Sequence, residues 1–119
     1  MIRAVALALL LAPVPLLAQE TVTPGTGAII RALDKLTGEV VDLRIANGAS
    51  AVFGRITVSL RECRYPEGNP SGDAYAFVTV QEKDKDTPAF AGWMVGSSPA
   101  LNAMDHPRYD VWALRCTIS

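Results

Sequence analysis

Apolar and polar residues alternate along most of this chain, and this period of two predicts β-strands that are buried on one face. The clearest example is residues 40–45, VVDLRI, where the polar Asp42 and Arg44 separate apolar neighbours. A short apolar segment, residues 28–33, precedes it, and the turn-forming residues 34–39 lie between the two. The pattern therefore predicts a β-hairpin in this part of the chain.

A second alternating stretch, residues 52–64, follows the turn dipeptide Asn47-Gly48 and predicts a long strand. Cys63 lies on the polar side of this alternation. Because a buried disulfide would need the opposite side, the sequence predicts a bulge or twist near Glu62, or a bridge at the sheet margin.

The rest of the chain predicts three more strands. Residues 65–73 hold two prolines and two glycines and predict a loop. Residues 74–81 carry apolar side chains on both faces, which favours a central strand, and the charged residues 82–86 predict a solvated turn. Residues 90–95 and 109–116 predict the last two strands.

One short helical segment is predicted between those last strands, at residues 97–104. Ser98 could cap it, and Pro99 would occupy the first helical position. The fold class is therefore all-β. We expect six or seven antiparallel strands in a small sandwich or a partly open barrel, with one short helical turn.

The N-terminal residues predict export. Arg3, an apolar run at residues 4–12 and a small residue at position 18 are typical of a signal peptide over residues 1–18, and the apolar run is too short to span a membrane. Residues 19–27 predict a flexible leader and residues 28–119 a single β domain. The mature protein is expected to be soluble and exported.

The charge balance indicates no nucleic-acid partner. Removing the signal peptide takes away one basic residue and no acidic residue, which leaves ten basic and twelve acidic residues, a net charge of about −2. A nucleic-acid binder would carry a clustered basic excess, and none is present in the sequence.

The two cysteines, Cys63 and Cys116, predict an intramolecular disulfide, because an oxidising compartment favours its formation. The alternatives are a metal pair or a redox couple. Two lone cysteines supply only half of a structural zinc site, and the sequence has no C-x-x-C motif.

Residues 92–116 concentrate the chemically distinctive side chains, including both tryptophans and the single histidine. Trp93 and Trp112 are predicted as core anchors, although exposure beside a tyrosine would favour a carbohydrate or protein contact instead. On the connection between the last two strands, Asp105 as a turn or capping acceptor and His106 as a residue held extended before Pro107 give a structural interpretation. The functional interpretation is a candidate contact surface at Ser98, Asp105, His106, Arg108 and Tyr109.

Catalytic and metal-binding interpretations of this region are weaker. A serine nucleophile, Ser97 or Ser98, would need a base within hydrogen-bond reach and a third group that orients the base. Adjacent Asp105 and His106 would point apart in an extended segment, and the sequence has no G-x-S-x-G motif. A single histidine and scattered carboxylates do not predict a metal site. No catalytic residue, metal or cofactor is therefore predicted.

Several motifs resemble the domain-of-unknown-function 2155 family of small exported proteins from Gram-negative bacteria. They are GWM at residues 92–94, SSPALNAMDHPRYDVW at residues 97–112 with the closing Cys116, and the earlier segments RALDKLTGEV and FGRITVSLRECRY. The resemblance covers roughly residues 28–117. It implies a periplasmic protein without assigned catalytic residues. Family genes often neighbour one for an accessory subunit of respiratory complex I, which implies a partner at the periplasmic face of a respiratory assembly.

Three functions remain open at this point. The first is a noncatalytic periplasmic interaction or accessory protein of an envelope or respiratory assembly. The second is a β domain that binds a glycan or small molecule, which needs a concavity lined by aromatic side chains. The third is an enzyme, which needs polar groups that converge in a cleft.

Overall fold

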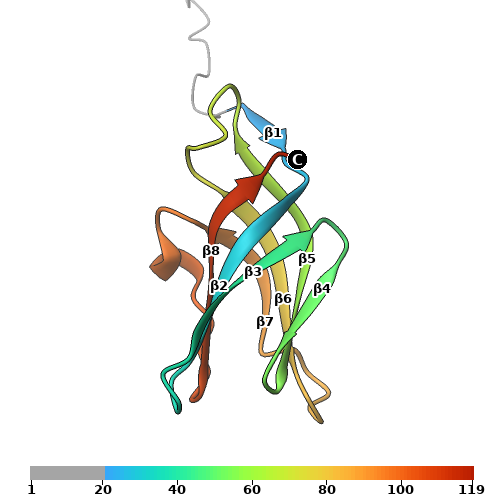
Figure 1. The fold of residues 1–119 in the computed structure, drawn as a ribbon, viewed down its shortest axis with the longest axis vertical. Coiled ribbons are helices and arrows are strands. Elements are labelled where there is room, and N and C mark those ends of the chain that lie inside the picture. Colours follow the sequence, from blue (N-terminus) through green and yellow to red (C-terminus); the bar gives the residue numbers. More distant parts are fainter. Residues whose placement is uncertain (1–20) are drawn as a thin grey trace, which may run out of the picture.

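The described residues, 21–119 of the computed structural model, form an antiparallel β-sandwich (Figure 1). The predicted signal peptide and the first two residues of the predicted leader lie outside them. The strands are β1 (Val22–Pro24), β2 (Gly27–Asp34), β3 (Val40–Ala46), β4 (Ser50–Phe53), β5 (Ile56–Pro66), β6 (Tyr75–Glu82), β7 (Phe90–Val95) and β8 (Tyr109–Thr117).

The strands form two sheets. The five-stranded sheet has the order β1-β5-β6-β7, with β4 also paired to β5, and the three-stranded sheet has the order β3-β2-β8. Every strand pair is antiparallel. The all-β fold class is confirmed as a sandwich, because the two sheets do not join into a closed barrel.

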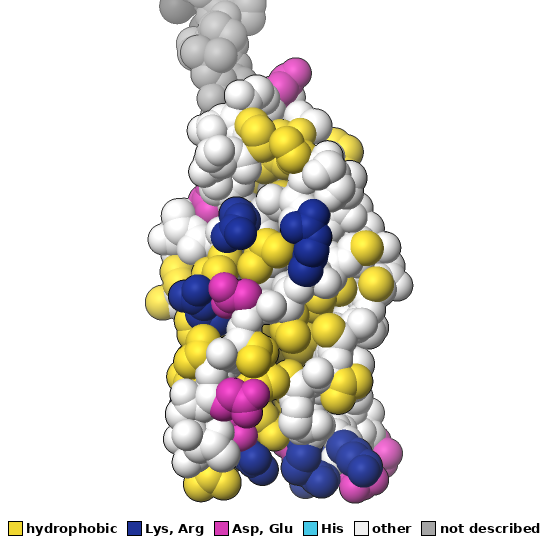
Figure 2. All heavy atoms as spheres, viewed as in Figure 1, with side chains coloured by type: hydrophobic (Ala, Val, Ile, Leu, Met, Phe, Trp, Pro, Cys, Tyr) yellow, Lys and Arg dark blue, Asp and Glu magenta, His cyan; other side chains and the backbone are white. Residues whose placement is uncertain are grey.

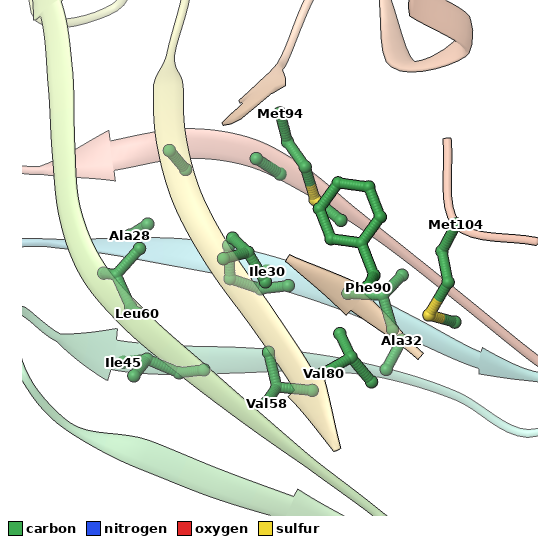
Figure 3. Packing of buried hydrophobic residues seen from close by; sticks show 14 of the residues in the cluster. Ala28, Ile30, Ala32, Ile45, Val58, Leu60, Val80, Phe90, Met94 and Met104 are labelled. Atoms are coloured by element: carbon green, nitrogen blue, oxygen red, sulfur yellow. The ribbon is translucent and has the colours of Figure 1, made fainter. Parts of the chain in front are cut away.

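The core lies between the sheets, where small and branched side chains alternate with outward-facing residues along each strand. Ile30 of β2, Val58 of β5 and Val80 of β6 are fully buried and lie close together (Figure 3). Phe90 and Met94 of β7 complete this cluster near the edge of the five-stranded sheet. Alternation of apolar and polar positions therefore predicts the buried face of these strands correctly.

The predicted hairpin is confirmed by the pairing of β2 with β3, which runs from Gly27 opposite Ala46 to Leu33 opposite Val40. The single strand predicted over residues 52–64 is wrong. The chain reverses at Gly54, where φ is +56°, so β4 and β5 form a second hairpin. The tight turn is hard to detect because only Gly54 and Arg55 separate the apolar residues 51–53 from Ile56, and two such residues fit within an alternating strand pattern.

Part of the predicted leader is a strand. Residues 22–24 form β1, which pairs with the last three residues of β5 from Val22 opposite Pro66 to Pro24 opposite Arg64. This pairing extends β5 into the segment predicted as a loop. Pro66 is the last residue of β5, and a proline is tolerated at a strand end, so the pairing can continue up to this residue. The described residues contain eight strands, more than the six or seven predicted.

The predicted bulge in β5 is confirmed. The register between β5 and β6 shifts between Leu60 and Glu62, so that Arg61 is the extra residue. The shift turns Cys63 from the polar side of the alternation to the buried side, where its exposure is 0%. Cys63 forms the predicted disulfide with Cys116, with an S–S distance of 2.03 Å. The bond joins β5 of one sheet to β8 of the other.

The short helical segment is confirmed as a 3-10 turn, η1 (Pro99–Asn102), with Pro99 at its start. Ser98 precedes the turn, but its hydroxyl makes no capping hydrogen bond. Instead, the Asn102 side-chain amide donates to the main-chain oxygen of Trp93 over 2.8 Å, which fastens η1 to β7. Within residues 21–119, no helix has the length and apolar character needed to cross a bilayer.

Candidate contact surface

Aromatic and arginine side chains gather on the outer face of the five-stranded sheet. Strand β6 buries Ala76, Val78 and Val80, and the residues that alternate with them, Tyr75 and Phe77 among them, therefore face outward. Cross-strand register places Phe77 opposite Trp93 of β7, and Tyr75 opposite Arg64 of β5. We call Arg61, Arg64, Tyr75, Phe77 and Trp93 the aromatic-arginine patch.

The side chains of the patch contact one another in specific geometries. The rings of Phe77 and Trp93 meet edge to face, with centroids 5.4 Å apart. The guanidinium carbon of Arg61 lies 5.4 Å from the Phe77 ring centroid, and that of Arg64 lies 5.7 Å from the Trp93 ring centroid. Cation–π contacts of this kind hold the arginine side chains against the rings while their polar atoms remain accessible.

Neither tryptophan is a core anchor, so that part of the sequence-based prediction is wrong. Trp93 is 39% exposed. Trp112 lies opposite Arg31 on the outer face of the three-stranded sheet and is half-buried beside a hollow of about 380 Å³ next to η1. The alternation in residues 74–81 puts Tyr75 and Phe77 on the face opposite Ala76 and Val78, and this is the signal in the sequence for an aromatic outer surface.

The outer face of the three-stranded sheet differs from the patch in its charge pattern. Arg31 binds Asp42 through two hydrogen bonds of 2.7 and 3.1 Å. The Arg31 contact, first as a hydrogen bond and then through its charge, lowers the pKa of Asp42. The view in Figure 2 likewise shows basic and acidic side chains interspersed among hydrophobic ones. Such paired charges contribute solubility more than specific attraction.

The burial of Tyr109 contradicts its place among the five residues predicted as a contact surface. Tyr109 is only 1% exposed and belongs to the core, where its ring packs edge to face on Phe53 with a centroid distance of 5.9 Å. Its hydroxyl oxygen accepts a hydrogen bond from the main-chain N–H of Arg55 over 3.0 Å. A Cβ atom at Gly54 would lie 2.5 Å from that hydroxyl, so the turn requires glycine. Asp105 is the one of the five that is exposed, and Ser98, His106 and Arg108 are half-buried.

His106 is a structural residue with both ring nitrogens engaged. Its Nδ1 atom accepts hydrogen bonds from the main-chain N–H groups of Arg108 and Tyr109, each over 3.0 Å. Because Nδ1 accepts twice, the ring proton belongs on Nε2, which donates to the Glu82 carboxylate. That hydrogen bond lowers the pKa of Glu82. The histidine side chain is 11% exposed.

Arg108 binds the nearly buried Asp34 at the end of β2, with the closest contact at 2.9 Å. The hydrogen bond from Arg108 is the main cause that lowers the pKa of Asp34 to about 2. Lys35 donates to the main-chain oxygen of His106 over 2.6 Å. His106 binds Glu82 of β6 and Arg108 binds Asp34 of β2, so the segment before β8 connects the two sheets at the start of that strand. The disulfide connects the sheets at the other end of β8. Sequence reasoning missed Asp34 and Glu82, because nothing in their spacing indicates these partners.

Replacement of Arg108 by glutamine is expected to weaken the dependence of stability on pH between about pH 4 and pH 2. The pKa of Asp34 is about 2 when folded, below its ordinary value of 3.8, so its contribution to stability is complete above pH 4 and is lost as the pH falls through 2. Urea unfolding at several pH values measures this effect. Arg44→Gln, which removes an exposed arginine whose side chain donates to the Ser119 oxygen and has no ion pair with an acidic side chain among residues 21–119, is the control. Identical pH profiles for Arg108→Gln and the parent would contradict the assignment.

Ser97, one of the two serines considered as nucleophiles, has a carboxylate as its hydrogen-bond partner. Ser97 donates its hydroxyl to Asp73 over 2.5 Å, and Asp73 also accepts the main-chain N–H groups of Ala74 and Ser97. Burial opposes ionisation of Asp73, but these hydrogen bonds together lower its pKa. His106 and Ser97 are therefore each committed to a different carboxylate.

A hollow of about 470 Å³ lies beside the Glu82–His106 pair, with Lys85 and Asp105 also in its wall. Residues 21–119 contain no group of three or more histidine, cysteine or acidic side chains placed to hold a metal ion.

Fold and surface together define a small β-sandwich with a disulfide between its sheets and an aromatic-arginine patch on one outer face. The chain belongs to the family described as "Uncharacterized protein conserved in bacteria (DUF2155)", whose model matches residues 28–116. The resemblance noted from the sequence motifs is thereby confirmed.

One curated relative is an uncharacterized protein of Rickettsia prowazekii (strain Madrid E), which is 34% identical over 94 residues. The match covers 76% of this chain and 61% of the Rickettsia protein, so the chain spans less than two thirds of that relative's length. No solved structure matches the chain.

Proposed function

We propose that this chain is a noncatalytic interaction protein of the bacterial cell envelope, accessory to an envelope or respiratory assembly, and that the aromatic-arginine patch is its contact surface. The observation that carries the proposal is the exposure of Trp93 beside Phe77 on an open sheet face. Tryptophan, tyrosine and arginine supply most of the binding energy in protein interfaces, because they combine a large apolar area with hydrogen-bonding groups.

Location in the periplasm is supported by two features of the chain. The predicted signal peptide would export it, and the Cys63–Cys116 disulfide suits an oxidising compartment. The respiratory context comes from the gene neighbourhood of the family that the sequence motifs resemble. A noncatalytic role is supported by the commitment of His106 and Ser97 to structural hydrogen bonds.

Replacement of Trp93 by alanine is expected to abolish co-purification of a specific envelope protein with a tagged copy of this chain. The substitution removes the exposed part of the patch and leaves the core intact, because Trp93 lies outside the core cluster. Quantitative mass spectrometry of native envelope extracts measures the difference. Val40→Ala is the control, since Val40 is 52% exposed on the other sheet. The proposal fails if no protein depends on Trp93 more than on Val40.

Binding of a glycan is a second candidate, favoured by a hollow of about 290 Å³ that is lined by Val22, Arg64, Tyr75 and Trp93. A sugar ring could stack on the indole of Trp93 in this hollow. Titration with peptidoglycan fragments, followed by tryptophan fluorescence, tests this candidate. A saturable change that is present in the parent and absent in Trp93→Ala would favour it, and an unchanged spectrum would dismiss it.

A further inference from the structure

The aromatic-arginine patch has an excess of positive charge on a chain whose formal net charge is −1. Arg64 pairs with Glu62 over 2.9 Å. In the described part of the chain, Arg61 forms no ion pair with an acidic side chain, and its guanidinium group rests on the Phe77 ring. On the other sheet Arg31 is bound to Asp42 by two hydrogen bonds, and the exposed Arg44 and Arg115 have no aromatic ring beneath them among the cation–π contacts of the described residues. The patch therefore offers a guanidinium group whose hydrogen-bond donors are available to a carboxylate.

An apolar hollow lies beside this charge. Val22 of β1, Tyr75 of β6 and Trp93 of β7 line it, and Arg64 forms its charged side. Its volume of about 290 Å³ is at or below the lower end of the roughly 300 to 1,000 Å³ typical of small-molecule sites. One large apolar side chain from a partner is a suitable occupant, as in the anchor pockets of protein interfaces.

The lining of the hollow favours a protein segment over a sugar. Glycan recognition needs several polar groups placed to hydrogen-bond the hydroxyls of the ring. Arg64 and Tyr75 are the polar side chains in this lining, and Arg64 is already shared with Glu62. The other two lining residues, Val22 and Trp93, present mainly apolar surface, which suits an apolar side chain, and the guanidinium groups of the patch suit flanking carboxylates.

We propose that the partner presents a segment in which acidic residues flank an aromatic or large aliphatic residue, with a carboxylate on Arg61 and the apolar side chain in the hollow beside Trp93. This inference rests on the proposed function, because it describes the partner of the same surface. Complementary charge of this kind speeds association and fixes the register of the segment more than it adds affinity. Binding is therefore expected to weaken as salt concentration rises.

A synthetic peptide, Ser-Gly-Glu-Glu-Phe-Glu-Glu-Gly-Ser, tests the inference on the full chain as processed and purified from expressing bacteria. We expect it to bind and to shift the NMR signal of the Trp93 indole N–H. Arg61→Gln is expected to weaken binding about fivefold, the effect of losing one exposed charge-assisted contact. Arg115→Gln, an exposed arginine of β8 on the other sheet, is expected to leave binding unchanged.

Three results would overturn the inference. The first is that a peptide with lysine in place of glutamate binds as well as the acidic peptide, and the second is that a peptide with alanine in place of phenylalanine does so. The third is that oligogalacturonate, but not the acidic peptide, shifts the NMR signal of the Trp93 indole N–H. The last result would favour an anionic glycan. Failure of this inference can be distinguished from failure of the proposed function. If co-purification still depends on Trp93 while the peptide does not bind, the interaction role stands and only the acidic character of the partner is wrong.

Discussion

Replacement of both Cys63 and Cys116 by alanine is expected to lower the free energy of unfolding by about 4 kcal/mol. The two residues are 53 positions apart, and closing a loop of that length removes a corresponding amount of chain entropy from the unfolded state. Small domains have total free energies of unfolding of about 5 to 15 kcal/mol, so the double alanine variant is expected to be close to unfolding at physiological temperature. Urea unfolding of the parent and of the double variant measures the loss.

The double variant avoids leaving an unpaired thiol, which would confuse the comparison through intermolecular disulfides. Treatment of the parent with a reducing agent under native conditions is a second route to the same state. A loss below about 1 kcal/mol by both routes would show that packing of the sheets, rather than the covalent bond between β5 and β8, holds them together.

Replacement of Tyr109 by alanine is expected to cost about 3 to 5 kcal/mol, the range for removal of a large buried aromatic side chain. Tyr109 begins β8 and is almost fully buried, with its ring against Phe53 and its hydroxyl at the Gly54–Arg55 turn. Loss of the ring would open the end of the sandwich that the disulfide does not connect. Thermal or urea unfolding measures the change in stability.

Tyr109→Phe is the matched control, because it keeps the ring and removes only the hydrogen bond accepted from Arg55. Its expected cost is about 1 kcal/mol, the typical net value of one hydrogen bond. A cost below about 1.5 kcal/mol for Tyr109→Ala would contradict burial of this residue. It would restore Tyr109 to the contact surface that the sequence alone predicted.

Patterns of local origin were predictable from the sequence. The strand segments, the hairpin before Asn47-Gly48 and the start of η1 at Pro99 follow from side-chain period and turn chemistry. The bulge was also predictable, because burial of Cys63 conflicts with the phase of the alternation before it. Two local features were missed, the turn at Gly54 and strand β1, because a tight turn and a three-residue strand leave little periodic signal.

Long-range contacts were not predictable in the same way. The sequence favours a structural role for His106, held extended before Pro107, and offers a contact surface with Arg108 as the alternative, but it identifies no partner for either side chain. Their partners Glu82 and Asp34 lie 24 and 74 positions away along the chain, on strands of different sheets. No spacing rule connects such positions without the fold. The tryptophans were misplaced for a related reason, since their size favours burial while strand phase directs them outward.

Site-specific photo-crosslinking in living cells tests the central claim most directly. A photoreactive phenylalanine analogue is placed at position 93 or 61 in the aromatic-arginine patch, or at position 40 or 44 on the other sheet as the control. The account predicts a discrete crosslinked product to the same protein from positions 93 and 61, and none of that product from positions 40 and 44. Crosslinks that form only from positions 40 and 44 would contradict it.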